Sequence, residues 1–108
     1  MSSLTTHVLD ISRGMPARGM MVELWSVEPS KLLKTAKTND DGRLDSPLLA
    51  GTEMAVGSYE LIFHVGDYFR QKAFLDRVPV RFTITDPSAK YHVPLLVSPW
   101  SYTTYRGS

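Results

Sequence analysis

The sequence contains no cysteine. A disulfide, a thiolate nucleophile and a sulfur-ligated metal are therefore excluded. An excess of charge of either sign is also absent, because twelve Lys and Arg residues nearly balance eleven Asp and Glu residues and leave a net charge of +1. With no basic run of about five residues, the sequence gives no sign of a nucleic-acid-binding or membrane-binding surface.

Long hydrophobic runs are missing as well. No apolar stretch reaches the roughly 18 residues that a helix needs to cross a bilayer, and MSSLTTHVLD at the start has neither the basic nor the apolar segment of a signal peptide. We therefore expect a cytoplasmic protein without a membrane partner. A chain of 108 residues, 43% hydrophobic and 21% charged, is typical of one globular domain, which we expect to span residues 1–108.

Catalytic signature motifs are equally scarce. The sequence has no G-x-S-x-G nucleophile elbow, no phosphate-binding P-loop and no G-x-G-x-x-G dinucleotide loop. Its histidines, His7, His64 and His92, lack the H-x-H, H-x₃-H or HExxH spacing of zinc ligands. We therefore expect neither a metal nor a cofactor.

What the sequence does contain is alternation of apolar and polar residues along most of its length. A period of two is typical of a half-buried β-strand. GSYELIFHV is the clearest example, with Tyr59, Leu61, Phe63 and Val65 predicted on one face. Turn-rich breaks at regular spacing indicate about eight short strands and an all-β, antiparallel sandwich. The alternating segments are residues 4–10, 20–27, 32–38, 57–65, 78–85, 91–97 and 100–105.

Two segments depart from this alternation. Asp41-Gly42 predicts a tight turn, because glycine adopts positive φ without steric cost. DYFRQKAF, residues 67–74, predicts the one short helix, about two turns long with Asp67 as its N-cap. No internal repeat, linker or low-complexity segment is present.

Two of the histidines are predicted on the strand face that lies opposite the more regular stripe of apolar residues. His92 lies beside Leu96, opposite the apolar stripe of its strand, and His7 lies beside Leu9 in the same way. A strand with apolar residues on both faces is covered on both, and in a domain this small we expect the cover to be another copy of the chain. Pro94 predicts a bulge or a locally unpaired stretch, because proline cannot donate to a sheet.

Each of these polar residues could have a purely structural role instead of a catalytic one. A lone strand histidine is more often a hydrogen-bonded structural residue than a catalyst, and we take that view of His64, which lies beside Glu60 on a solvent face. For His7 and His92, each taken alone, we also favour a structural role. Arg43 follows a turn and is by default a solvated charge. Spacing alone therefore predicts a β-sandwich without a stated function.

Longer motifs carry a resemblance to a known family. THVLD, TNDDGR, YELIFHVGDYF, VPVRF and above all YHVPLLVSPWSYTTYRGS resemble the 5-hydroxyisourate hydrolases, transthyretin-related enzymes of urate breakdown. The resemblance extends from about Leu4 to Ser108, and the final YRGS is its most specific element. It implies the transthyretin-like sandwich of two four-stranded antiparallel sheets with one short helix, assembled as a homotetramer (a dimer of dimers) with active sites where the dimers meet.

Transthyretin itself, a carrier of small aromatic ligands, is the alternative, because SPWSYTTY resembles one of its segments. Four features favour the enzyme, since transthyretin lacks the counterparts of His7, Arg43, His92 and the YRGS ending. The chain is shorter than many of these hydrolases around Lys72–Phe74, which leaves the conformation of that loop open. A non-catalytic binder of aromatic ligands remains the second hypothesis.

The resemblance also implies roles for three polar residues. In the hydrolysis of 5-hydroxyisourate, water opens the N1–C6 cyclic amide to give 2-oxo-4-hydroxy-4-carboxy-5-ureidoimidazoline. His7 and His92 would bracket the attacked carbonyl, one activating water and the other polarising or protonating the leaving nitrogen. Arg43 would hold the substrate's oxygens with its planar fork of donors. Which histidine is the base stays open, as does incidental zinc binding by the histidines.

The last four residues are implied to complete the site. Tyr105 and Arg106 would shape the pocket, Gly107 would contact the substrate, and Ser108 would bind substrate or orient water through its hydroxyl or a terminal carboxylate. Only the small-molecule substrate and other copies of the chain are implied as partners.

Overall fold

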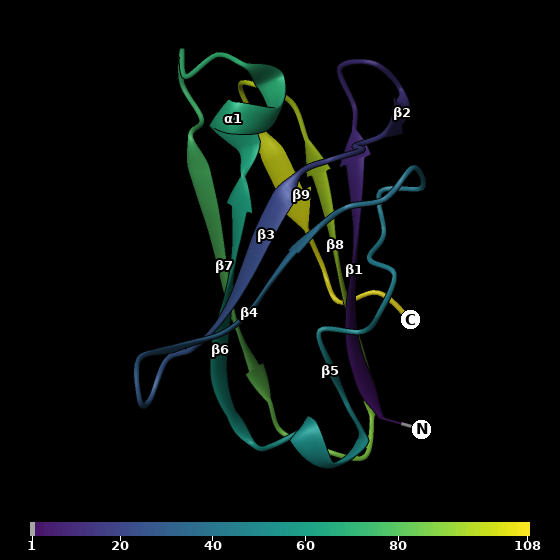
Figure 1. Cartoon of the computed structure of the whole chain (residues 1–108), viewed down its shortest axis with the longest axis vertical. Helices are drawn as coiled ribbons and strands as arrows, with labels where there is room; N and C mark the ends of the chain where they lie inside the picture. The colour runs from purple at the N-terminus through teal and green to yellow at the C-terminus, as the bar shows by residue number, and fades with distance from the viewer. Residues whose placement is uncertain (1) are drawn as a thin grey trace.

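The computed structural model describes residues 2–108 as two β-sheets packed face to face, with one short helix at one end (Figure 1). The first sheet has the strand order β2-β1-β8-β9, with β5 also paired to β1. Its strands are β1 (Ser3–Asp10), β2 (Met15–Pro16), β5 (Leu49–Ala50), β8 (Lys90–Val97) and β9 (Tyr102–Thr104). The second sheet has the order β4-β3-β6-β7. Its strands are β3 (Met21–Ser26), β4 (Lys31–Lys37), β6 (Gly57–His64) and β7 (Arg77–Ile84).

The predicted sandwich with one short helix is confirmed, but the expectation of purely antiparallel sheets is wrong for one pair of strands. β1 and β8 run parallel, with Thr5 opposite His92 and His7 opposite Pro94. Sequence neighbours joined by tight turns must be antiparallel, whereas β1 and β8 are joined through the whole second sheet, so either direction is open to them. The first sheet also has five strands rather than four, because the short β5 pairs with the beginning of β1.

The core lies between the two sheets and follows the predicted alternation. Along β1 every second residue is buried, and on β8 the predicted stripe is buried in the same way. Burying a Leu or Phe side chain stabilises the fold by about 1.5–3 kcal/mol relative to its exposure. The largest fully buried side chains are Phe63, Leu4, Met20, Leu24, Leu48, Leu61, Ile84 and Leu95.

The helix begins earlier than predicted. α1 spans Val65–Phe69, whereas the sequence predicted residues 67–74 with Asp67 as N-cap. Val65 and Gly66 are buried, and the Gly66 N–H donates to the Asp76 carbonyl 2.8 Å away, so packing against the loop before β7 decides where the helix starts. Asp67 is exposed inside the first turn. Within residues 2–108, no helix is long and apolar enough to cross a membrane.

The loop after the helix, which the sequence left open, forms no regular element. Arg70 ends α1 in the left-handed conformation, with φ of 58°. Lys72–Phe74 is exposed, and the Leu75 N–H then donates to the Pro99 carbonyl at 3.2 Å, which ties the loop to the first sheet. A 3-10 turn, η1 (Gly51–Glu53), follows β5.

A buried polar network fastens the helix to the end of β1. Asp10 is fully buried, and its carboxylate accepts hydrogen bonds from the N–H and hydroxyl of Ser12 and from the N–H of Arg13. Tyr68 of α1 donates its hydroxyl to the other oxygen at 2.8 Å. Burial, and then this hydrogen bond, raise the pKa of Tyr68 to about 12. The carboxylate is therefore fully satisfied, as a buried charge requires.

Candidate active site

His92 lies on the outer face of the first sheet, opposite Thr5 of the parallel neighbour β1. The Thr5 Oγ1 is 2.8 Å from the His92 Nδ1. The His92 ring is half-buried, while the residues on either side of it, Tyr91 and Val93, point into the core. The face predicted for His92 is therefore confirmed, and the ring is held by a neighbour that the sequence analysis did not identify.

His7 lies on the same outer face, two residues further along β1 than Thr5. Its Nε2 is 2.9 Å from the carbonyl oxygen of Asp41. A carbonyl oxygen only accepts hydrogen bonds, so the Nε2 of His7 carries a proton in this arrangement. The geometry thereby fixes the tautomer of a neutral His7 and leaves its Nδ1 as the nitrogen with a lone pair.

The loop that supplies the Asp41 carbonyl is held by hydrogen bonds around Asn39. The Asn39 side-chain oxygen accepts from the N–H groups of Asp41, at 2.9 Å, and Arg43, at 3.1 Å. The Asn39 N–H donates to the Arg43 carbonyl at 2.7 Å, and the Gly42 carbonyl accepts from the Val8 N–H at 2.8 Å. The predicted turn therefore lies across β1 and places Asp41 and Arg43 beside the outer face.

Gly42 is required at this crossing. Its φ is +75°, and a Cβ at this position would lie 2.3 Å from the backbone oxygen of Val8. We expect Gly42→Ala to lower the free energy of unfolding by at least about 2 kcal/mol, because left-handed backbone alone costs alanine about 1–2 kcal/mol and the clash adds to it. Urea denaturation followed by circular dichroism measures this change. Gly14→Ala is the control, since Gly14 has a similar φ of +68° but no atom within 4 Å of its Cβ position; equal losses in the two variants would contradict the role given to the crossing.

Arg43 brings positive charge to His92. Its side chain is exposed and lines a small cleft, of about 130 Å³, together with Thr5, Thr6, Leu44 and Ser46. Burial lowers the pKa of His92 below its ordinary 6.5, and the charges of Arg43 and then His7 lower it further. His92 is thus a neutral imidazole at neutral pH, the form that accepts a proton.

The C-terminal segment reaches the same face. After β9 the chain continues beside β8, where Gly107 forms an isolated antiparallel bridge with His92 and donates its N–H to the His92 carbonyl at 2.7 Å. A Cβ on Gly107 would lie 2.7 Å from the Cδ2 of His92 and 3.4 Å from a Pro94 side-chain carbon. On this side of β8, Pro94 lies in the unpaired interval between the bridge and the β9 ladder, which starts at Leu95, whereas on the other side it lies opposite His7 in the β1 ladder; the predicted unpaired stretch is thus present on one side only. Backbone and ring of His92 are therefore both in contact with the segment.

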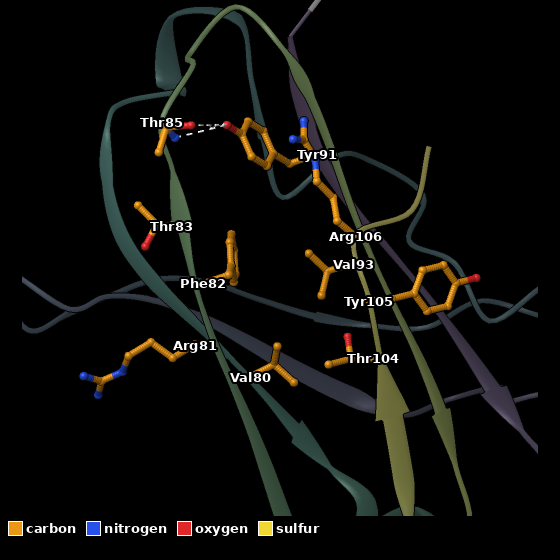
Figure 2. Close-up of a pocket in the computed structure, with 10 residues that line it drawn as sticks. All are labelled: Val80, Arg81, Phe82, Thr83, Thr85, Tyr91, Val93, Thr104, Tyr105 and Arg106. Carbon is orange, nitrogen blue, oxygen red and sulfur yellow. Dashed lines mark hydrogen bonds between the residues drawn. The ribbon is translucent and has the colours of Figure 1, made fainter.

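The other members of the YRGS ending take separate positions. Arg106 faces away from His92: its guanidinium lies 4.2 Å from the centre of the Tyr91 ring and donates to the Lys90 carbonyl at 3.1 Å. Tyr105 is exposed, and in Figure 2 its ring extends away from the pocket between the sheets that its backbone helps to line. Ser108 follows Gly107 directly and is exposed.

That pocket, of about 330 Å³, is separate from the histidine-bearing face (Figure 2). It opens between β7 and the β8–β9 edge and includes neither His7, His92 nor Arg43. Its walls are mainly apolar, with Arg106 at one end. The residues that line it are Val80, Arg81, Phe82, Thr83, Thr85, Tyr91, Val93, Thr104, Tyr105 and Arg106.

His64, for which the sequence favoured a structural role, lies on the other sheet. Its Nε2 contacts the Glu23 carboxylate of β3, whose other oxygen accepts from the Trp25 indole N–H at 2.8 Å. These hydrogen bonds, from Trp25 first and His64 second, lower the pKa of Glu23. Among residues 2–108, no three His, Cys, Asp or Glu side chains come close enough to bind one metal ion.

The structure thus brings four of the seven predicted site residues into one neighbourhood: His7, Arg43, His92 and Gly107. Arg106 is turned to the opposite face of β8, because side chains alternate along the segment that carries it. Thr5 and the Asp41 carbonyl, the partners of the two histidines, were not predicted from the sequence. Thr5 shares the predicted face of His7, so alternation could have suggested it, but the pairing of β1 with β8 has no local signal.

Comparisons with known proteins match the chain over nearly its whole length. The family model described as "HIUase/Transthyretin family" matches residues 4–107. A protein of Rhizobium meliloti named 5-hydroxyisourate hydrolase 2 is 52% identical over 114 residues, covering 97% of this chain and 95% of that protein. The structure of Klebsiella pneumoniae 5-hydroxyisourate hydrolase superposes with a TM-score of 0.87 at 34% identity, with both chains fully covered. That of an (S)-allantoin synthase superposes with a TM-score of 0.93 at 47% identity; the match covers 99% of this chain but 44% of that one.

Proposed function

Because the chain belongs to the HIUase/transthyretin family, we propose that it hydrolyses 5-hydroxyisourate to 2-oxo-4-hydroxy-4-carboxy-5-ureidoimidazoline. Full-length relatives about half identical to it bear the hydrolase name, and the chain is a hydrolase of this kind. The observation that carries the proposal is the convergence of His92, His7 and Arg43 on one half-buried face. Together they supply a base, a second imidazole and a fixed positive charge.

His92 is the base of the proposed reaction. Water attacks the C6 carbonyl of the substrate, and its proton passes to the Nε2 of His92, which is neutral at rest because burial and Arg43 lower its pKa. The C6–N1 bond then breaks, C6 becomes a carboxylate and N1 leaves with a proton. A neutral imidazole with a pKa below neutrality is suited to the first step, since its lone pair is free at the operating pH.

His7 and Arg43 act on the leaving nitrogen and the oxygens. The Asp41 carbonyl holds the His7 ring through Nε2–H, so the bare Nδ1 can take the remaining hydroxyl proton of the tetrahedral intermediate and pass it to N1 as the C6–N1 bond breaks. Arg43 binds the carbonyl oxygens of the planar ring with its fork of donors and offsets the negative charge that develops on them. Within the final segment, Gly107 packs on His92, and Tyr105 shapes the surroundings. Arg106 anchors the segment from the other face of β8, and the Ser108 hydroxyl binds substrate or orients water.

A second copy of the chain completes the site in this proposal. The histidine-bearing face is partly apolar, with Pro94 buried and Leu9 and Leu96 half-buried beside the imidazoles. Covering this face in a homotetramer would exclude water and strengthen each polar contact with the substrate. Light scattering on the purified protein tests the assembly, which a monomeric mass at assay concentration would contradict.

The activity itself is tested with freshly made substrate. Uricase generates the unstable 5-hydroxyisourate in a cuvette, and its ultraviolet decay is followed with and without the protein. We expect decay to accelerate in proportion to protein concentration. Unchanged decay would overturn the proposal and favour the non-catalytic binder of aromatic ligands, which titration with a fluorescent hydrophobic probe would then measure.

The lowered pKa of His92 predicts a pH profile. We expect kcat/KM to fall on the acid side with a midpoint below 6.5, the ordinary pKa of histidine, because protonation of His92 removes the base. The same group makes the folded state less stable as pH falls from about 6.5 through its folded pKa, since the unfolded chain binds the proton first. Titration of the ring by NMR should give a higher pKa for His92 in Arg43→Gln, because the second-largest cause of the shift is removed.

The control for this titration is Arg81→Gln. Arg81 belongs to the second sheet and pairs with Glu60 at 3.1 Å, so its removal should leave the pKa of His92 unchanged. An unchanged pKa in Arg43→Gln, or an equal rise in both variants, would contradict the electrostatic coupling between Arg43 and His92.

A further inference from the structure

Thr5 and Thr6 are adjacent threonines of β1 with different tasks. Thr6 points into the core, is 2% exposed, and donates its hydroxyl to the Val93 carbonyl at 2.6 Å. Thr5 points to the outer face, where its Oγ1 lies 2.8 Å from the Nδ1 of His92. The hydroxyl of Thr6 thus satisfies a buried backbone group, whereas that of Thr5 contacts the proposed base.

The Thr5–His92 contact is set by the backbone. The parallel register places Thr5 directly opposite His92, and the Gly107 N–H fixes the His92 carbonyl from the other side. Threonine is β-branched and stiff at χ1, so its hydroxyl is held in place at little entropic cost. The His92 ring is therefore held by Oγ1 at one nitrogen, which leaves Nε2 as the nitrogen available to a ligand.

The direction of this hydrogen bond decides what His92 can do. A hydroxyl can donate to Nδ1, which puts the ring proton on Nε2 and blocks that nitrogen as a base. A hydroxyl can instead accept from Nδ1–H, which leaves the lone pair on Nε2. The accepting arrangement persists when Nε2 takes up a proton, because Nδ1 then still carries its hydrogen and no group has to turn.

We propose that Thr5 is a positioning residue of the hydrolase site, whose hydroxyl accepts a hydrogen bond from the Nδ1–H of His92 and so presents a bare Nε2 to the attacking water. This inference rests on the proposed function for its catalytic consequence but not for the tautomer. The proposal also assigns different tautomers to the two histidines. An obligate acceptor, the Asp41 carbonyl, keeps a proton on the Nε2 of His7, while Thr5 keeps that of His92 free.

The tautomer is tested first, by ¹⁵N NMR of the imidazoles in the wild-type protein without substrate. Above its pKa, the His92 ring should show a protonated Nδ1 and an unprotonated Nε2, and His7 the reverse. In Thr5→Val, which keeps the shape and loses the hydroxyl, the His92 signals should move toward the Nε2–H form that imidazoles in water prefer. A wild-type His92 protonated on Nε2 would overturn the proposal.

The catalytic consequence is tested by turnover. Thr5→Val should lower kcat about 10-fold, a part of the usual general-base contribution, with KM changed by less than about twofold. Thr5→Ser, which restores the hydroxyl, should recover most of the rate. Thr35→Val is the matched control, because Thr35 lies exposed on β4 of the other sheet. Wild-type kcat in Thr5→Val, or equal losses in Thr5→Val and Thr35→Val, would overturn the proposal. If the wild-type protein left 5-hydroxyisourate untouched, the proposed function would fail while the NMR result would still decide the role of Thr5 in orienting the ring.

Discussion

His92→Ala should turn over 5-hydroxyisourate at least about 10²-fold more slowly than the wild-type protein, the usual size of a general acid–base contribution. The variant loses the neutral imidazole that takes the proton from water. The fold should persist, because the ring lies on the outer face and makes one side-chain hydrogen bond, to Thr5. Initial rates with uricase-generated substrate measure the loss, and circular dichroism reports the fold.

His7→Ala should show a loss of similar size, since the second imidazole serves the leaving nitrogen. The matched control is His64→Ala, in which the same change is made on the second sheet. His64 contacts Glu23 and lies near Asp67, so its loss should lower the free energy of unfolding while kcat stays at the wild-type value. Wild-type rates in either His7→Ala or His92→Ala would remove the proposed chemistry, whatever the stability of the variants.

These expectations depend on a face that the sequence indicated through alternation alone. A period of two shows which residues share one face of a strand. It placed His7 and His92 opposite the buried stripes, as the structure does. Successive side chains point to opposite faces in parallel and antiparallel strands alike, so this period does not show which strands pair or in which direction. The parallel register that puts Thr5 against His92 therefore could not be predicted.

The start of the helix was misplaced for a related reason. Asp67 is a good N-cap by residue type, but the buried side chain of Val65 and the hydrogen bond from Gly66 to Asp76 begin the helix two residues earlier. Tertiary contacts outweigh the N-cap preference of a residue in so short a helix, because it contains few backbone hydrogen bonds. The turn at Gly42 was predictable because positive φ is a local requirement.

Arg106 shows how a motif can be recognised without its geometry. The YRGS ending suggested that its members act together, yet successive residues of an extended segment point to opposite faces. Gly107 lies against His92 and Arg106 lies over Tyr91 on the other side of β8. The contribution of Arg106 to the proposed site in one chain is therefore to anchor the segment that carries Gly107, through the Tyr91 ring and the Lys90 carbonyl.

The anchored segment leads to the second large effect, expected for Gly107→Ala. A Cβ at this position would lie 2.7 Å from the Cδ2 of His92, closer than side-chain carbons approach one another. Either the ring turns away from Thr5 or the segment moves off β8, and both changes misplace the base. Because a displacement of about 1 Å can cost about 10²-fold in rate, kcat should fall by about that factor.

Stability should change little in Gly107→Ala, which distinguishes it from Gly42→Ala. Gly107 has no positive φ that would strain an alanine, and it lies at the surface end of the segment rather than beneath a crossing loop. The ¹⁵N signals of the His92 ring should move in this variant while those of His64 stay in place. Gly19→Ala is the control for activity, since Gly19 lies in an exposed turn with no atom near its Cβ position. Wild-type kcat with undisturbed His92 signals in Gly107→Ala would show that the segment does not constrain the ring, and the proposed base would then depend on Thr5 alone for its orientation.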